Sequence, residues 1–232
     1  MPSALTLRSV TSALRRHYGA PPPPVSRDPF RLILWEQVGY LASDAKRRAA
    51  YLKLRDEVGL APMAILGAPR ATLETIARMG GSIAADRRAS RMRESAELVV
   101  ARWDGDLRRA LRLPLPEARR ALSAFPMIGE PGADKILAIA GKARLLAMDS
   151  NALRVVSRLA LAPELKDYRS TYRRARELLA PALPRTREQV VAAGALLRLH
   201  GQELCRRSGP RCERCPLRAH CPSAGRPMKD LW

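Results

Sequence analysis

Lys and Arg outnumber Asp and Glu by 42 to 22 among the 232 residues, which gives the chain a net charge of +20 at pH 7. Such a basic chain indicates a polyanionic partner, either nucleic acid or, less specifically, an anionic membrane. Hydrophobic residues make up 47%, enough for one domain or two small lobes with a real core. No apolar run reaches the ~18 residues that a membrane-spanning helix needs. We therefore expect no membrane partner, and nucleic acid is favoured.

The N-terminal segment, residues 1–19, reads as one short helix. It carries Ser and Arg but no acidic residue, a composition that transit peptides share. It lacks the continuous apolar stretch of a secretory signal, and we interpret it as part of the mature protein. The four prolines that follow, Pro21 to Pro24, predict a stiff and extended connector.

Helical periodicity dominates the rest of the chain, and no segment shows the alternating pattern of a strand. Asp28 and Pro29 form a strong helix start, with Asp as the N-cap and Pro in the first turn. This helix is expected to run to Ser43, and it is apolar on nearly all sides, which is typical of a buried helix. Further helices are expected at residues 45–58, 61–66, 70–79, 84–103, 106–112, 116–125, 150–161, 170–179 and 186–199. The sequence therefore predicts an all-α fold.

A turn rich in Gly and Pro lies inside the stretch from Phe125 to Arg154 and joins two helix-patterned segments. The turn reads Met127-Ile128-Gly129-Glu130-Pro131-Gly132. Glycine lets backbone N–H groups approach an anion closely, and a helix N-terminus carries unpaired donors. The turn is therefore a candidate phosphate contact. Asp149, further on, has the residue type and place of an N-cap, where a carboxylate is held by backbone donors.

All four cysteines lie within residues 205–221, at Cys205, Cys212, Cys215 and Cys221. This clustering argues against a scattered disulfide framework and favours a metal site in a reduced compartment. Four thiolates in one loop can bind a tetrahedral zinc ion or a cubane iron–sulfur cluster. Zinc ribbons usually pair two short CxxC knuckles, and only one is present here. The spacing therefore favours a [4Fe–4S] cluster, with zinc as the alternative.

Three motifs occur together in this chain. They are the cysteine spacing preceded by Leu199-His200-Gly201, the turn Phe125-Pro126-Met127-Ile128-Gly129, and the segment from Met148 to Val155. The combination resembles the helix-hairpin-helix (HhH-GPD) DNA glycosylases of the endonuclease III and MutY type, whose hairpin reads LPGVG and whose third motif reads VDTHxxRV. A weaker similarity to the MutY branch covers Pro29 to Tyr51. The resemblance extends over residues 28–222.

The resemblance implies two helical lobes. One would comprise residues 28–148, with the hairpin at about 116–140, and the other residues 1–27 and 149–222, with the cluster loop at 205–221; residues 223–232 would be a tail. It also implies an enzyme that flips a damaged or mispaired base out of double-stranded DNA and hydrolyses its N-glycosidic bond. We expect a monomer in a bacterial-type cytoplasm, associated with the nucleoid.

The resemblance implies roles for individual residues. Asp149 would stabilise the cationic transition state at the sugar; its alternative role is a plain helix cap. Met127, Gly129 and Gly132 would contact the DNA backbone. Glu36 falls where the MutY branch carries its acid–base Glu, and the apolar helix around it would favour the protonated carboxyl. Its alternative is a helix-edge Glu paired with an Arg.

Two departures from the family pattern bear on the reaction. Bifunctional members place a nucleophilic Lys two residues after the second hairpin Gly, and this position is Pro131 here. Proline within a chain has no free amine, so a monofunctional glycosylase that uses water is favoured. Lys135, one helical turn further, is the candidate nucleophile of the alternative, a bifunctional glycosylase and AP lyase. The first hairpin Gly is replaced by Met127, and Gly132 is expected to restore freedom to the turn.

Further candidates for DNA contact are less specific. Tyr40 and Leu41 fall near the family's intercalating positions, although Leu41 could equally pack in the core. Arg87 and Arg88 follow a Gly-Gly turn and are candidate phosphate contacts. His200 is interpreted as a structural histidine beside the cysteines. A catalytically silent module that binds lesions or distorted DNA remains an alternative, and the sequence does not identify the excised base.

Overall fold

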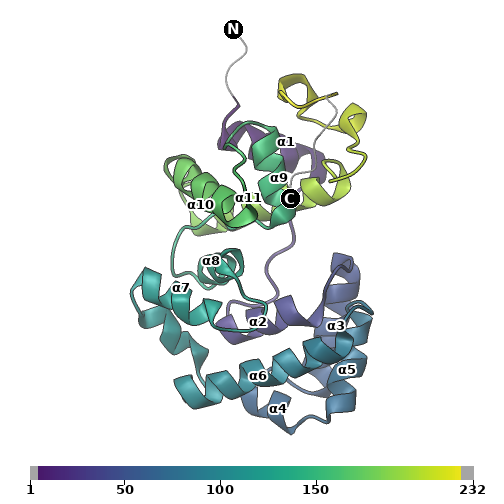
Figure 1. The fold of residues 1–232 in the computed structure, drawn as a ribbon, viewed down its shortest axis with the longest axis vertical. Helices are drawn as coiled ribbons and strands as arrows, with labels where there is room; N and C mark the ends of the chain where they lie inside the picture. Colours follow the sequence, from purple (N-terminus) through teal and green to yellow (C-terminus); the bar gives the residue numbers. More distant parts are fainter. Residues whose placement is uncertain (1–4, 226–232) are drawn as a thin grey trace. The chain divides into compact units, whose positions relative to one another are not determined.

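The computed structural model describes residues 5–225 and divides into two compact units. The hairpin unit runs from Pro24 to Lys142, and the cysteine unit comprises the residues up to Pro23 and from Ala143 onward. The sequence placed these boundaries at 27/28 and 148/149; most of its expected tail, residues 226–232, lies outside the described residues. All regular structure between residues 5 and 225 is helical (Figure 1), so the predicted all-α fold is confirmed.

The hairpin unit is built around α6. Its helices are α2 (Pro29–Val38), α3 (Asp44–Glu57), α4 (Pro62–Gly67), α5 (Arg70–Met79), α6 (Ala85–Trp103), the 3₁₀ helix η1 (Leu107–Arg112), α7 (Leu115–Ser123) and α8 (Glu130–Ile139). Ala89, Met92, Ala96 and Val99 recur at three- and four-residue spacing on α6 and are fully buried. This apolar face packs against α2, α4, α5 and η1, so α6 is the central helix of the unit (Figure 1).

Helix α2 is shorter than the sequence predicted. It ends at Val38 rather than at Ser43, because Gly39 adopts extended backbone and Leu41 takes a left-handed conformation with φ of 48°. Ser43 instead caps the next helix, since its side chain accepts a hydrogen bond from the Lys46 N–H. The apolar character of Tyr40 and Leu41 suggested that the helix continued, but both side chains are exposed.

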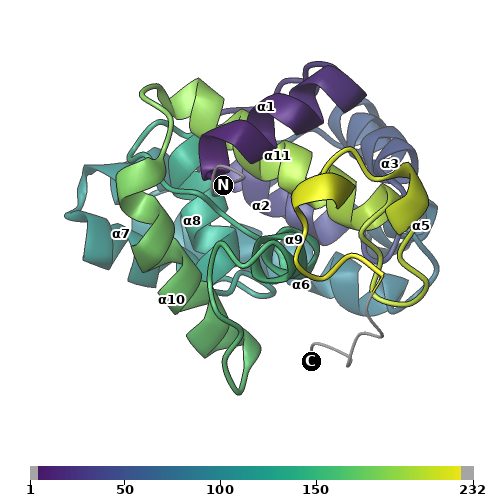
Figure 2. The ribbon, with the colours of Figure 1, turned by 90° about the horizontal axis from the view of Figure 1, so that it is seen from above.

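The cysteine unit packs α9 (Ser150–Arg158) against α11 (Arg187–Glu203), with α1 (Leu7–Tyr18) on α11 and α10 (Tyr168–Leu179) on α9 (Figure 2). Short 3₁₀ turns follow at η2 (Ala180–Ala182), η3 (Cys212–Arg214) and η4 (Arg218–His220). The α9–α11 contact requires glycine at position 201, because a Cβ there would lie 2.5 Å from the Asn151 carbonyl oxygen. The start of α9, where Asp149 lies, is thereby held close to the end of α11.

No helix within residues 5–225 combines the length and the apolarity needed to cross a membrane.

The core of the cysteine unit is formed by apolar side chains from all four of its described α-helices, among them Leu14, Leu153, Tyr172 and Leu197.

Candidate functional site

The hairpin turn joins α7 to α8, and Met127 carries its conformational strain. Met127 has φ of 66°, a left-handed conformation that costs a residue with a Cβ roughly 1–2 kcal/mol. Gly132, expected to restore freedom to the turn, does not do so, because it lies inside the first turn of α8. Gly129 precedes α8, and no side chain caps the helix N-terminus. Met127 is 38% exposed, so it presents its side chain to solvent at the tip of the turn.

A buried glutamine connects the hairpin to the rest of its unit. The Gln37 amide on α2 donates to the Pro126 carbonyl at 3.0 Å and to the Ser95 hydroxyl at 2.7 Å. The side chain is fully buried. The hydrogen bonds fix the start of the hairpin turn relative to α2 and α6.

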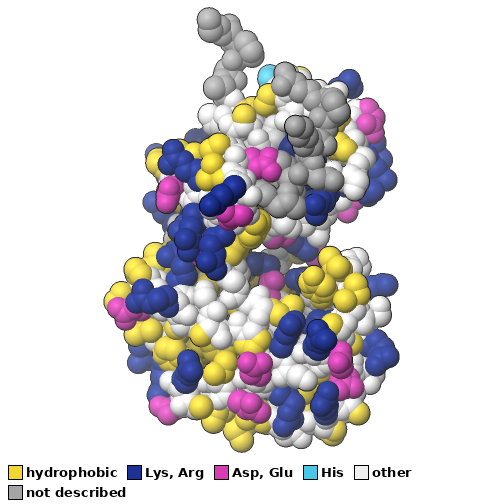
Figure 3. All heavy atoms as spheres, in the orientation of Figure 1, with side chains coloured by type: hydrophobic (Ala, Val, Ile, Leu, Met, Phe, Trp, Pro, Cys, Tyr) yellow, Lys and Arg dark blue, Asp and Glu magenta, His cyan; other side chains and the backbone are white. Residues whose placement is uncertain are grey.

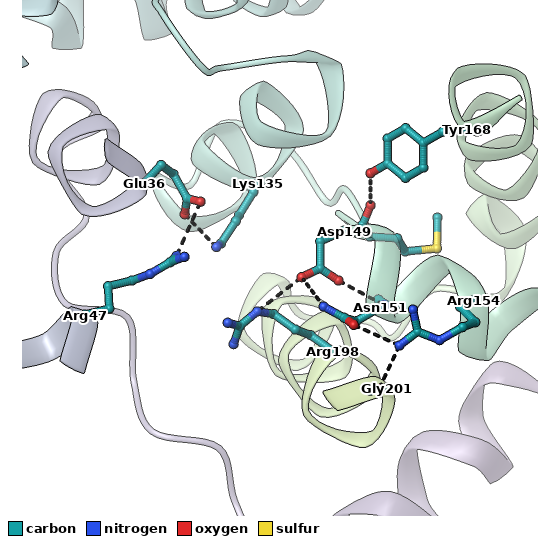
Figure 4. A network of polar contacts seen from close by, with 11 residues as sticks. Glu36, Arg47, Lys135, Asp149, Asn151, Arg154, Tyr168, Arg198 and Gly201 are labelled. Atoms are coloured by element: carbon teal, nitrogen blue, oxygen red, sulfur yellow. Dashed lines mark hydrogen bonds and ion pairs between the residues drawn. The ribbon is translucent and has the colours of Figure 1, made fainter. Parts of the chain in front are cut away.

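Glu36 and Lys135, which the sequence nominated separately, form an ion pair. The Lys135 Nζ lies 2.6 Å from Glu36 Oε1, and an Arg47 guanidinium nitrogen lies 3.7 Å from Oε2 (Figure 4). The Glu36 side chain is 22% exposed. The surroundings of Glu36 are therefore not apolar, because two cations face its carboxylate. The ion pair with Arg47 agrees with the alternative of a Glu paired with an Arg. Arg47 also lies over the Trp35 ring, 5.6 Å from its centroid.

Two loops of the hairpin unit, residues 39–43 and 80–84, lie side by side and line one pocket of about 250 Å³. Backbone contact between them is close: the Tyr40 N–H donates to the Gly80 carbonyl at 3.1 Å. A Cβ at Gly80 would lie 2.0 Å from the Val38 carbonyl oxygen. The Gly-Gly pair is therefore required by the approach of the two loops.

Arg88 binds the loop 80–84 and the end of α2, where the loop 39–43 begins. It is 1% exposed, and its guanidinium donates to the carbonyls of Val38 at 2.7 Å, Ile83 at 3.2 Å and Gly81. The prediction that Arg88 contacts phosphate is thus wrong, because its donors are committed to three backbone carbonyls inside the protein. Its neighbour Arg87 is exposed and stays a candidate.

The two loops present apolar side chains to solvent. Leu41 is 77% exposed and Tyr40 45%, so the alternative that Leu41 packs in the core is wrong. Ile83, on the second loop, is 52% exposed and lines the same pocket. Sequence reasoning missed Ile83, because only the pairing of the two loops brings it to Leu41; an apolar residue directly after a Gly-Gly turn was the available signal.

Arg88→Met is expected to lower the free energy of unfolding by about 2–4 kcal/mol, because it leaves three carbonyls inside the protein without their donor. The matched control is Arg87→Met, one position earlier on the exposed face of α6, which should change stability by less than about 0.5 kcal/mol. Urea unfolding followed by circular dichroism measures both. Equal effects of the two substitutions would contradict this role of Arg88.

Asp149 is both the N-cap of α9 and a solvent-accessible carboxylate. Its Oδ1 accepts from the Ala152 N–H at 2.9 Å, while Oδ2 lies 3.2 Å from Arg198 Nε and 3.5 Å from Asn151 Nδ2 (Figure 4). The side chain remains 41% exposed. The helix-cap role is thus observed, and the exposed part of the carboxylate leaves the predicted role at the sugar open. Arg198 was missed, because it lies far along the chain in an unremarkable stretch of α11.

A partly buried tyrosine donates a hydrogen bond to the segment before Asp149. The Tyr168 hydroxyl donates to the Met148 carbonyl at 3.1 Å. Burial, and next the negative charge of Asp149, raise the pKa of Tyr168 well above its usual value. The hydroxyl therefore keeps its proton and remains a hydrogen-bond donor at neutral pH.

Arg154 and Arg158 connect α9 to the cysteine loop. Arg154 donates to Asn151 Oδ1 at 2.8 Å, to the Gly201 carbonyl at 2.7 Å and to the Cys205 carbonyl at 2.8 Å. Arg158 donates to the carbonyls of Cys205 at 3.3 Å and Arg206 at 2.6 Å. Both guanidinium side chains are nearly fully buried. The helix that carries Asp149 and the loop that carries the cysteines thus form one connected polar structure.

The four cysteines are free thiols, each half-buried, and all of them line one cavity. Donors surround their sulfurs: Arg158 lies 3.4 Å from Cys205 Sγ, and the Leu217 N–H lies 3.4 Å from Cys215 Sγ. Burial raises the pKa of the Cys215 and Cys221 thiols. Within residues 5–225, no three His, Cys, Asp or Glu side chains converge closely enough to hold one metal ion.

His200 is 1% exposed and lies beside the cysteines, as the sequence indicated. Its Nε2 is 3.4 Å from Cys215 Sγ and its Nδ1 is 3.0 Å from the Tyr18 hydroxyl. Burial, and next the charge of His17, lower the pKa of His200 to about 4. The imidazole is therefore neutral at physiological pH.

Positive charge is spread over the surface of each unit. On the face shown in Figure 3, Lys and Arg side chains outnumber acidic ones over both units. In the cysteine loop, the exposed cations are Arg207, Arg214 and Arg218. This distribution agrees with the polyanionic partner that the net charge of +20 indicates.

Comparison with known proteins was made for sequence and fold. No family model matches the chain. Endonuclease III homolog 1, chloroplastic, of Arabidopsis thaliana is 28% identical over 205 residues, which cover 87% of this chain and 51% of that protein. Endonuclease III of Sulfolobus acidocaldarius is 26% identical over 200 residues, covering 84% and 82%. A solved structure of endonuclease III trapped as a covalent intermediate with DNA has a TM-score of 0.73 at 20% identity, covering 95% of this chain and 97% of that one. The chain is endonuclease III-like.

The endonuclease III-like chain spans about half the length of the Arabidopsis relative and most of the Sulfolobus one. The family resemblance that the three motifs indicated is confirmed, and the helical fold matches that of endonuclease III. The departures identified in the sequence lie inside this shared fold: Met127 and Pro131 stand in the hairpin itself.

Proposed function

We propose that this endonuclease III-like chain is a DNA glycosylase that flips a damaged or mispaired base from duplex DNA and removes it by hydrolysis. The observation that carries the proposal is Asp149, a carboxylate with one oxygen held by a backbone N–H and 41% of the side chain still exposed. The likeness to endonuclease III in sequence and fold supports the same assignment. The net charge of +20 supplies the electrostatic attraction to DNA.

Asp149 has the chemistry that the bond cleavage needs. Breaking an N-glycosidic bond leaves positive charge on the sugar, and a preorganised carboxylate stabilises that charge without having to reorient. The N-cap hydrogen bond from Ala152 and the contacts of Oδ2 with Arg198 and Asn151 fix the carboxylate. The same carboxylate accepts the proton from the water that attacks the sugar.

The proposed reaction uses water rather than a lysine nucleophile. Pro131 stands where bifunctional members carry Lys, and it lies in the first turn of α8. Lys135, the alternative nucleophile, is paired with Glu36 at 2.6 Å. An ammonium group paired with a carboxylate has no lone pair available for attack on the sugar. Both observations favour a monofunctional glycosylase without AP lyase activity.

Glu36 is proposed as the acid–base group that donates a proton to the leaving base. Its two cationic neighbours, Lys135 and Arg47, orient the carboxylate. The two loops with Leu41 and Ile83 are proposed to fill the space that the flipped base leaves.

The four cysteines are proposed to hold a [4Fe–4S] cluster. The donor set fits, since four cysteines line one cavity. Cys205 accepts from a guanidinium, and Cys215 accepts from a backbone N–H and lies 3.4 Å from an imidazole nitrogen. Bound there, the cluster would keep the thiols as thiolates and fix the loop. A brown protein that absorbs near ~400 nm is expected, whereas a colourless protein favours zinc.

A panel of single-lesion duplexes tests the proposed reaction. It would contain uracil and thymine mispairs, oxidised pyrimidines, adenine opposite oxidised guanine, hypoxanthine and alkylated purines. At least one duplex is expected to yield a cleaved strand only after hot alkali, because a monofunctional enzyme leaves an abasic site intact. That duplex identifies the substrate.

Two other outcomes would change the assignment. A cleaved strand without alkali, together with a covalent adduct after borohydride reduction, would show a lyase, and Lys135→Gln would then test its nucleophile. No processing of any duplex, combined with tight binding to abasic DNA, would favour a catalytically silent lesion-binding module.

A further inference from the structure

A chain of hydrogen bonds leads from the N-terminal helix to one cysteine. The Tyr18 hydroxyl, at the end of α1, lies 3.0 Å from His200 Nδ1, and His200 Nε2 lies 3.4 Å from Cys215 Sγ. The Tyr18 and His200 rings also meet edge to face, with centroids 5.9 Å apart. Three side chains from three separate segments of the cysteine unit are thus aligned.

The direction of these hydrogen bonds depends on the state of Cys215. A neutral imidazole has one nitrogen that donates and one that accepts. A thiolate bound to a cluster has no proton to give, so His200 Nε2 must carry the hydrogen and donate to the sulfur. His200 Nδ1 is then the acceptor, and the Tyr18 hydroxyl must be its donor. A tyrosine hydroxyl keeps its proton at neutral pH and can therefore donate.

We propose that Tyr18 is a positioning residue for the cluster: it holds His200 in the tautomer that donates Nε2–H to the Cys215 thiolate and so raises the reduction potential of the cluster. Hydrogen bonds to the sulfurs are among the factors that set the potential of an iron–sulfur cluster, because they stabilise the more negative, reduced state. The inference rests on the [4Fe–4S] cluster proposed above.

The contact is specific to one of the four ligands. Cys215 receives two donors, His200 Nε2 and the Leu217 N–H at 3.4 Å. The Leu217 donor is part of the backbone and is not affected by Tyr18. Loss of the tyrosine hydroxyl should therefore weaken the donation to Cys215 only in part, so that the cluster shifts in potential and is still retained.

Tyr18→Phe tests the proposal, because it keeps the ring against His200 and removes only the hydroxyl. The cluster is measured by its absorbance near ~400 nm and its potential by voltammetry of the protein on a DNA-free electrode. The expected result is a brown protein whose potential has shifted to more negative values. Tyr168→Phe is the matched control, because it removes a partly buried hydroxyl of the same unit that donates to the Met148 carbonyl rather than to His200. Its potential should equal that of the unchanged protein.

A double substitution distinguishes an effect of the Tyr18 hydroxyl on the His200 tautomer from other effects of that hydroxyl on the potential. Glutamine at position 200 donates through an amide that has no tautomers, so adding Tyr18→Phe to His200→Gln should produce no further shift. A brown Tyr18→Phe protein with an unchanged potential would overturn the role of Tyr18 alone. An unchanged protein that is purified under reducing conditions and is colourless would overturn the cluster and this inference together.

Discussion

Asp149→Asn should lower the rate of base excision by about 10²–10⁴-fold and leave the fold intact. The amide removes the negative charge that stabilises the cationic sugar and the base that accepts a proton from water. Asparagine is as good an N-cap as aspartate, so the hydrogen bond from the Ala152 N–H is retained. The measurement is a single-turnover assay on the duplex that the lesion panel identifies, with alkali treatment of each time point.

A second N-cap aspartate in the same unit provides the control. Asp167 caps α10, where its Oδ1 accepts from the Ser170 N–H at 2.8 Å. Asp167→Asn makes the same chemical change at a cap and is expected to leave the excision rate unchanged. If Asp149→Asn and Asp167→Asn had equal rates and melting temperatures, Asp149 would be only a helix cap.

The sequence was informative about Asp149 because the information there is local. An Asp before a helix start is an N-cap through hydrogen bonds to residues two and three positions on, and the structure places its Oδ1 on Ala152 N. The bounds of α5 were predictable for the same reason, since it spans Arg70–Met79, the range that the pattern indicated. Local patterns also located the four cysteines around one loop.

The contacts that the sequence did not indicate join residues that are far apart along the chain. Arg88 was predicted to contact phosphate because it follows a Gly-Gly turn, but its three acceptors are backbone carbonyls of the protein. One of them, at Val38, ends α2 and is 50 positions away in sequence. Sequence periodicity does not show which backbone carbonyls will accept a hydrogen bond from a distant side chain. The same applies to Glu36, whose apolar neighbours on α2 suggested apolar surroundings. Lys135, which is 99 positions away, faces it instead.

The sequence pattern also did not predict which residue of the hairpin turn has the strained backbone. The replacement of the first hairpin glycine by Met127 raised a question about the turn, and relief by the neighbouring Gly132 was the simpler expectation. The structure keeps the turn by placing Met127 itself at φ of 66°. The buried Gln37 amide, which holds the Pro126 carbonyl at 3.0 Å, is one of the contacts that stabilise this conformation. Such a contact depends on the packing of α2 against α8 and has no sequence signature.

Arg154→Met is expected to destabilise the protein by about 3 kcal/mol or more, and to release the cysteine loop. The substitution keeps a long apolar side chain but removes the donor from the Gly201 and Cys205 carbonyls, which are buried groups that no water replaces at low cost. A loss of this size corresponds to a fall in Tm of about 10 °C for a protein of this length. The same guanidinium holds Asn151 Oδ1, so the surroundings of Asp149 are disturbed as well.

The effect of Arg154→Met is tested by three measurements on one preparation: the melting temperature, the absorbance near ~400 nm and the single-turnover excision rate. All three should fall together for Arg154→Met, because the guanidinium is bonded both to the cysteine loop and to the residue beside Asp149. Arg169→Met, at an exposed position of α10, removes the same charge and should leave all three unchanged. A normal excision rate in an Arg154→Met protein that has lost its colour would mean that the cysteine loop and Asp149 are not coupled through α9.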